Sequence, residues 1–230
     1  IIPTPYWVSY TDIVELTGAS PILVKCGIDQ SFKMSPKQLE ESISEKTKIV
    51  VFNSPSNPTG SVYSKNELQE LSKILLKYPN IYILNDDIYE HIRLDDQPFN
   101  NIVMVEPKLK DRSIIINGVS KAYSMTGWRI GFAAGPEKII SAMSNLQSQS
   151  TSNPTSISQA AAQAALLGNQ SCITPMLDAF KERHTFVVNA FNNIKGLKCI
   201  DAKGAFYLFP YAKEAIQTLY KNGKIKKNDD

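Results

Sequence analysis

The sequence predicts an α/β fold in which helices flank a mostly parallel β-sheet. Short strand-like segments alternate with helix-like segments through the first part of the chain, a pattern typical of βαβ units. The strand-like segments are nearly continuous apolar runs, as expected of strands that are buried on both faces. Polar residues follow the ends of these runs, at the edge where open α/β sheets bind ligands.

The individual elements follow from local patterns. Apolar runs predict strands at residues 22–26, 48–52, 81–84 and 113–116, and a further β-like run at 204–210. Helical spacing predicts helices at residues 36–44, 65–78, 136–148, 157–167 and 175–193. Ser64 and Glu67 form a capping-box pattern at the start of the second of these helices. A change to a mostly helical pattern indicates a domain boundary near residues 168–175.

Composition and charge are those of an ordinary globular protein. Hydrophobic residues make up 43% and charged residues 20% of the 230 residues, so a sizeable core can form. The net charge of +3 is too small to imply a nucleic-acid or membrane partner. The basic cluster at residues 221–227 runs into residues 228–230 and is interpreted as a solvated, mobile tail.

Cysteine and histidine usage indicates a reducing compartment and no metal. Three widely spaced cysteines, an odd number, argue against a disulfide framework and favour the cytoplasm. His91 and His184 lie far apart, and no residues have metal-ligand spacing. We therefore expect these residues to serve packing or to lie on the surface.

Ser120-Lys121 is the first candidate for chemistry. A lysine at the end of an apolar strand is desolvated, which makes its amine a nucleophile toward carbonyl groups. A surface lysine at a turn would look the same by itself. Arg129 follows eight residues later between two glycines, and an arginine fork grips phosphate well, although a structural ion pair is the alternative.

Two further motifs precede this lysine. Asn57 lies in a loop that two prolines and a glycine stiffen, so its amide is held in place, although a simple turn is the alternative. Asp86 ends an apolar strand and Tyr89 follows three residues later. A buried carboxylate can hold a protonated ring nitrogen, which makes a heteroaromatic cofactor an electron sink. An Asx turn with a partly buried tyrosine is the alternative.

The order and spacing of these motifs resemble the class I/II aminotransferase family. Residues 118–131, Gly-Val-Ser-Lys-Ala-Tyr-Ser-Met-Thr-Gly-Trp-Arg-Ile-Gly, closely resemble the lysine signature of that family. Asn-Pro-Thr-Gly at 57–60 and Asp-x-x-Tyr at 86–89 precede it at the expected intervals. Residues 5–10 and 147–156 resemble segments of the bacterial aspartate aminotransferase branch.

The resemblance implies a fold, a cofactor and a reaction. The fold is that of the fold type I enzymes that depend on pyridoxal 5′-phosphate (PLP). It would comprise a PLP-binding large domain at residues 1–172 and the beginning of a smaller α+β domain at 173–230. The implied reaction transfers the amino group of L-aspartate to 2-oxoglutarate, in a homodimer. Close relatives that prefer glutamate or prephenate leave the substrate open.

The resemblance also implies roles for seven residues. Lys121 would bind PLP covalently and move the proton at the substrate Cα, and Asp86 would pair with the ring nitrogen. Tyr89 and Asn57 would contact the ring oxygen, and Asn57 would also touch the substrate. Arg129 and Ser120 would hold the phosphate. Trp7 would stack on the ring and border the substrate site. Gly118 stands where some relatives have a phosphate-binding hydroxyl.

The ends of the sequence predict a fragment. The first residues, Ile-Ile-Pro-Thr-Pro, look like a strand entered from an upstream segment. The resemblance implies a glycine-rich helix start before Trp7 and, beyond residue 230, an arginine for the substrate α-carboxylate. Either trimming or a split reading frame would explain this. A catalytically inactive remnant is the second hypothesis. A sensory domain of a transcription regulator ranks last, since the sequence has no DNA-binding segment.

Overall fold

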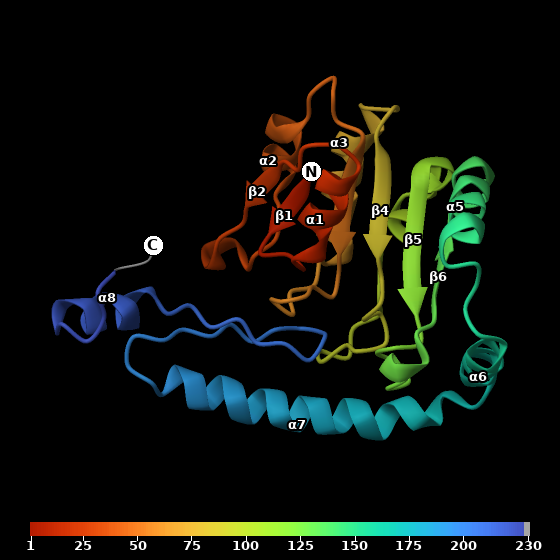
Figure 1. Ribbon diagram of the computed structural model, residues 1–230. Helices are drawn as coiled ribbons and strands as arrows, with labels where there is room; N and C mark the ends of the chain where they lie inside the picture. The colour runs from red at the N-terminus through yellow and green to blue at the C-terminus, as the bar shows by residue number, and fades with distance from the viewer. Residues whose placement is uncertain (228–230) are drawn as a thin grey trace.

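A four-stranded sheet in the order β3-β4-β5-β6 forms the centre of the molecule, in a computed structural model that describes residues 1–227 (Figure 1). Its strands are β3 (Ile49–Asn53), β4 (Tyr82–Asp86), β5 (Ser113–Gly118) and β6 (Gly131–Ala134). The first three are parallel, and β6 runs antiparallel to β5 at the edge. The prediction of a mostly parallel sheet is therefore confirmed.

A second, two-stranded parallel sheet extends the first one beyond β3. It consists of β1 (Ile2–Thr4) and β2 (Leu23–Lys25). The amino terminus of Ile1 donates a hydrogen bond to the Ile49 carbonyl at 2.7 Å. The Val51 amide donates to the Ile1 carbonyl at 3.0 Å. These two bonds place the start of β1 beside β3.

The helices occupy most of the remaining chain. The α-helices are α1 (Ser9–Leu16), α2 (Pro36–Ser42), α3 (Lys65–Leu76), α4 (Ile102–Val105), α5 (Glu137–Ser150), α6 (Ser156–Leu167), α7 (Ile173–Asn192) and α8 (Lys213–Lys221). Short 3₁₀ helices are η1 (Ile28–Gln30), η2 (Pro107–Arg112), η3 (Thr126–Trp128) and η4 (Gln170–Cys172). All predicted helices are present, with ends that differ by a few residues. The predicted capping box makes both of its hydrogen bonds at the start of α3.

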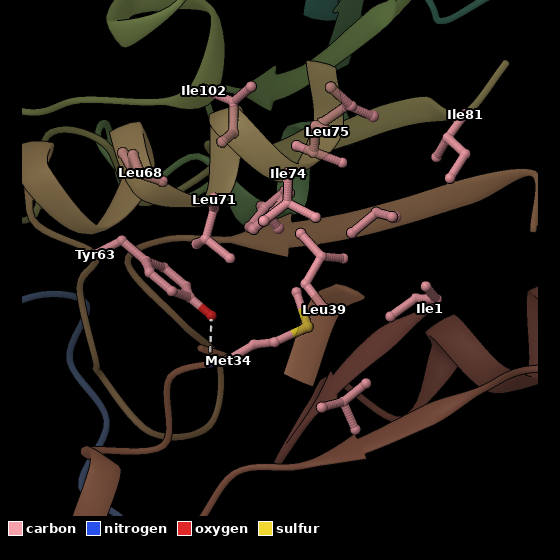
Figure 2. Close-up of a cluster of buried hydrophobic side chains, with 14 of the residues drawn as sticks. Ile1, Met34, Leu39, Tyr63, Leu68, Leu71, Ile74, Leu75, Ile81 and Ile102 are labelled. Carbon is pink, nitrogen blue, oxygen red and sulfur yellow. Dashed lines mark hydrogen bonds between the residues drawn. The ribbon is translucent and has the colours of Figure 1, made fainter. Parts of the chain in front are cut away.

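The main hydrophobic core lies between the sheet and α2, α3 and α4 (Figure 2). Leu39, Leu71 and Leu75 are fully buried there against Ile83 of β4. On α3, Leu68, Leu71 and Leu75 follow one another at i+3 and i+4 spacing, which gives this helix one apolar face. The Tyr63 hydroxyl accepts a hydrogen bond from the Met34 amide at 2.7 Å, so its polar end is satisfied inside the core.

A smaller cluster covers part of the opposite face of the sheet. Tyr10 and Val14 of α1 pack there against Val51 and Leu84. Val50 and Phe52 point into the main core, so β3 is buried on both faces, as the sequence predicts. In β4, buried and half-buried residues alternate, and β6 is largely exposed. The prediction of burial on both faces is therefore wrong for β4, because helices cover its two faces unequally.

The predicted β-like run at residues 204–210 is wrong as a strand. Only isolated bridges form, between Arg93 and Gly204 and between Lys198 and Tyr211. Ala205 has a φ of 54°, in the left-handed region, which interrupts an extended conformation. Its amide donates to the Ile92 carbonyl at 2.9 Å, so tertiary contacts replace a strand ladder. Strand β6 was not predicted, since its glycine and alanines have low strand propensity.

Helix α7 and the chain that follows it return toward the carboxyl ends of the central strands (Figure 1). Met176, Leu177 and Phe180 of α7 pack against a cluster that contains Tyr89 and Ala205. The division at residues 172 and 173 stays a prediction. Within residues 1–227, no helix combines the length and apolar character needed to cross a membrane.

The predicted basic tail is only partly described. Helix α8 includes Lys221, and the lysines at 224, 226 and 227 are exposed. Residues 228–230 lie outside the described residues. The three cysteines are free, and in the part of the chain that is described no cluster of histidine, cysteine and acidic residues is placed to hold a metal ion. His184 is buried and contacts Asp201, whereas His91 is exposed beside Glu90.

Candidate active site

Six of the seven predicted site residues lie at or just beyond the carboxyl ends of strands, and Arg129 lies before the amino end of the antiparallel strand β6, at the same edge. Trp7 follows β1, Asn57 follows β3, Asp86 ends β4 with Tyr89 three residues later, Ser120 and Lys121 follow β5, and Arg129 leads into β6. Strands β3, β4 and β5 are parallel, and the start of β1 is hydrogen-bonded to β3. The ends of these strands therefore meet at one edge of the sheet. That edge is the usual ligand-binding edge of an α/β sheet.

Asp86 is held by hydrogen bonds from two directions. The Tyr10 hydroxyl donates to Oδ2 at 2.5 Å, and the Ile88 amide donates to Oδ1 at 3.3 Å. Burial raises the pKa of Asp86 above its ordinary value, while the two donors and the charge of Lys121 oppose this shift. The carboxylate is thus oriented, largely desolvated and within electrostatic reach of a cation.

Lys121 lies among aromatic rings. Its Nζ is 5.8 Å from the ring centroid of Tyr89 and 5.9 Å from that of Phe206. Both distances are within cation–π range. The lysine is half-buried.

Asn53 connects two of the predicted loops. Its Nδ2 donates to the Asp86 carbonyl at 3.0 Å, and its Oδ1 accepts from the Asn57 amide at 2.7 Å. The Asn57 loop is therefore fixed to the end of β4. Burial raises the pKa of Tyr89, as does the hydrogen bond with Tyr207, whereas the Asn57 side chain lowers it. Asn57 and Tyr89 are thus close to each other.

Arg129 and Ser120 are connected through Thr126. The Arg129 Nη1 donates to the Thr126 carbonyl at 2.9 Å, and the Thr126 hydroxyl donates to the Ser120 carbonyl at 3.1 Å. Arg129 is exposed and has a φ of 56°, in the left-handed region. At Gly118 a Cβ would lie 2.8 Å from the Ile130 carbonyl oxygen, so the close approach of β5 and β6 favours glycine there.

Tyr10, Asn53 and Phe206 are site residues that the sequence did not single out. Trp7 joins the site through Tyr10, with ring centroids 5.6 Å apart and planes at 87°. Tyr10 lies three residues after Trp7 at the start of α1, and this helical spacing was an available signal. Nothing local in the sequence places Phe206 beside Lys121.

Asp87 lies behind this edge as a buried carboxyl group. It is 3% exposed, and the Asn101 Nδ2 donates to its Oδ2 at 2.6 Å. Burial, with the charges of Glu90 and Asp86, raises the pKa of Asp87 to about 7. Between pH 3.8 and about 7, the Asp87 carboxyl group is protonated in the folded chain but ionised in the unfolded chain. The free energy of unfolding therefore falls as the pH rises through this interval.

Replacing Asp87 by Asn is expected to remove this loss of stability. The amide is isosteric, still accepts from Asn101 and carries no charge at any pH. At pH 8 the free energy of unfolding of Asp87→Asn should exceed that of the parent by up to about 4 kcal/mol, with little difference near pH 4. Urea denaturation at both pH values measures this. The exposed Asp111→Asn is the control, and an equal difference at both pH values would contradict the prediction.

The fold and the whole length of the chain have known counterparts. The aspartate aminotransferase of Rhizobium meliloti superposes with a TM-score of 0.91 at 46% sequence identity, over 93% of this chain and 53% of that one. The aspartate aminotransferase of Thermus thermophilus with maleate gives a TM-score of 0.83 at 33% identity, over 94% and 55% of the two chains. The fold is therefore the aspartate aminotransferase fold.

The sequence match defines the family. Residues 1–225 match the model of the family Aminotransferase class I and II. The aspartate/prephenate aminotransferase of Nitrosomonas europaea is 54% identical over 230 residues, which are 100% of this chain and 58% of that protein. The chain belongs to the class I and II aminotransferases, a family of PLP-dependent enzymes. It spans little more than half the length of the relatives it matches.

The residues present fit the cofactor of this family. A carboxylate suited to a ring nitrogen, an amine suited to the aldehyde, a phenol and a guanidinium all lie at one edge of the sheet. A hollow lined by Tyr10, Asn53 and Asn57 also borders the Asn57 loop. This donor set is the one that a negatively charged pyridine derivative requires.

Proposed function

We propose that the chain forms the cofactor site of an aspartate aminotransferase, which transfers the amino group of L-aspartate to 2-oxoglutarate and yields oxaloacetate and L-glutamate. The observation that carries this proposal is the pairing of Asp86 with Tyr10 beside Lys121 at the ligand-binding edge. The names of relatives that are 46% to 54% identical support the choice of aspartate.

Each residue at this edge has a proposed task. Bound PLP would supply an electron sink for the substrate's bonding electrons. Asp86 would hold the protonated ring nitrogen, and Tyr89 and Asn57 would contact the ring oxygen. Arg129 would bind the phosphate through its guanidinium, with Ser120 beside it. Trp7 would cover the ring and border the substrate.

Lys121 would attach the cofactor and move the substrate proton. An amine beside two aromatic rings is partly shielded from water, which favours reaction with a carbonyl. The same amine would act as the base and acid that takes a proton from the substrate Cα and returns it. In its ionised form, the Asp86 carboxylate would favour the cationic form of the ring.

Prephenate is the second candidate acceptor. The Nitrosomonas europaea relative is called an aspartate/prephenate aminotransferase, and the identity of 54% spans the whole of this chain. An aminotransferase of glutamate preference and an inactive remnant are the remaining alternatives. The homodimer and the cytoplasmic location are proposals that rest on the family resemblance and on cysteine usage.

An amino-transfer assay tests the proposed function. The purified chain is mixed with PLP and L-aspartate, and the L-glutamate formed from 2-oxoglutarate is measured, with prephenate as a competing acceptor. We expect glutamate to form in proportion to the amount of chain. A visible band of covalently bound PLP without any amino transfer would instead identify an inactive remnant.

A further inference from the structure

We infer that Tyr207 is a positioning residue of the cofactor site, which acts by holding the phenol of Tyr89. This inference rests on the proposed function, in which Tyr89 contacts the cofactor. It assigns a role in the site to the chain segment that follows α7. This segment is distant in sequence from the strand ends that carry the other site residues.

The two phenols form a direct hydrogen bond. Their oxygens are 2.7 Å apart, and either hydroxyl can donate. Tyr89 is 3% exposed and Tyr207 is half-buried, so water competes little for this bond. A phenol donates one hydrogen bond and accepts others. When Tyr207 donates to Tyr89, the Tyr89 hydrogen stays free for an anionic oxygen of a ligand, and the bond it makes is strengthened.

Backbone hydrogen bonds join the residues just before Tyr207 to two loops, the one that carries Asn57 and the one that carries Tyr89. The amides of Lys203 and Gly204 donate to the Gly60 carbonyl at 3.2 Å and 3.1 Å, and Gly60 ends the Asn57 loop. The Ala205 amide donates to the Ile92 carbonyl, three residues after Tyr89. At Gly60, with a φ of 66°, a Cβ would lie 2.6 Å from the Ala202 Cβ. The segment at residues 203–205 is therefore hydrogen-bonded to the two loops that carry Asn57 and Tyr89.

Aromatic packing fixes the two rings as well. Tyr89 and Tyr207 have ring centroids 5.6 Å apart at 78°. Phe206 packs edge-on against Tyr89, at 5.6 Å and 79°, and in a tilted arrangement against Phe180 of α7, at 5.2 Å and 33°. Because Tyr89 and Phe206 also flank the Lys121 amine, the segment at residues 203–207 forms part of the surroundings of the lysine. A shift of Tyr207 would therefore be transmitted to Tyr89 and to the space beside Lys121.

The Tyr207→Phe substitution tests the hydroxyl while it keeps the ring. In the full chain, the dissociation constant of PLP is expected to rise about 3- to 10-fold, since a neutral hydrogen bond contributes to this extent. The pH midpoint of the visible PLP band should rise by a few tenths of a unit or more, because the Tyr89 hydrogen becomes a weaker donor. Tyr211→Phe, an exposed tyrosine of the same segment, should change neither quantity.

A double-mutant cycle without PLP separates this inference from the proposed function. Urea midpoints are compared for Tyr89→Phe, Tyr207→Phe and the double variant. We expect the second substitution to add almost nothing to the first. Additive midpoints, or a visible band whose pH midpoint is unchanged in Tyr207→Phe, would overturn the inference. A parent chain that forms no PLP band would contradict the proposed function, while the midpoints still decide whether the two hydroxyls are coupled.

Discussion

Replacing Lys121 by Ala is expected to abolish the covalent binding of PLP and to lower amino transfer by at least about 10⁴-fold. The substitution removes both the amine that attaches the cofactor and the group that moves the Cα proton, and a general acid–base step alone contributes 10²- to 10⁴-fold. The visible PLP band and the rate of L-glutamate formation measure the two losses separately.

A neighbouring lysine provides the control for this substitution. Lys203 is half-exposed and pairs with Asp201 at 2.5 Å, on the segment that approaches the site. Lys203→Ala should keep the PLP band and most of the turnover. Circular dichroism establishes that both variants are folded. Turnover of Lys121→Ala that is comparable to the parent would show that another group performs its steps.

The strand-end residues could be predicted because their position follows from the strand pattern alone. Asp86 and Lys121 each follow an apolar run, and the ends of neighbouring parallel strands meet. The capping box of α3 is equally local, since its donors and acceptors lie three residues apart. The fold class follows from the same short-range alternation of strands and helices.

The residues that the sequence did not single out are joined to the site by long-range contacts. Tyr10 bonds with Asp86 across 76 residues, and Tyr207 with Tyr89 across 118. No periodicity encodes such pairs. The segment at 204–210 has the composition of a strand, but tertiary hydrogen bonds and the left-handed Ala205 decide its conformation. Burial on each face of β4 also depends on where distant helices pack.

Replacing Asp86 by Ala is expected to slow proton exchange at the Cα of L-aspartate by roughly 10²- to 10³-fold, the usual loss for one electrostatic stabiliser in a desolvated site. The carboxylate would favour a positive charge on the ring nitrogen, and that charge draws electrons away from Cα. Uptake of deuterium from D₂O into L-aspartate, with the PLP-loaded chain, measures the rate. An unchanged rate would show that Asp86 is not the partner of the ring.

Tyr10→Phe separates the carboxylate from the hydrogen bond that orients it. The substitution keeps Asp86 and its charge but removes the donor at 2.5 Å, which opposes the effect of burial on the pKa of Asp86. The pKa of Asp86 therefore rises further, and the acid limb of the exchange rate shifts to higher pH. Above that limb, we expect a loss of no more than about 10²-fold, since one hydrogen bond to a charged group contributes about 1.5–3 kcal/mol and tenfold corresponds to about 1.4 kcal/mol. If Tyr10→Phe were as slow as Asp86→Ala at every pH, orientation of the carboxylate by Tyr10, and not its charge alone, would be the property on which the proposed reaction depends.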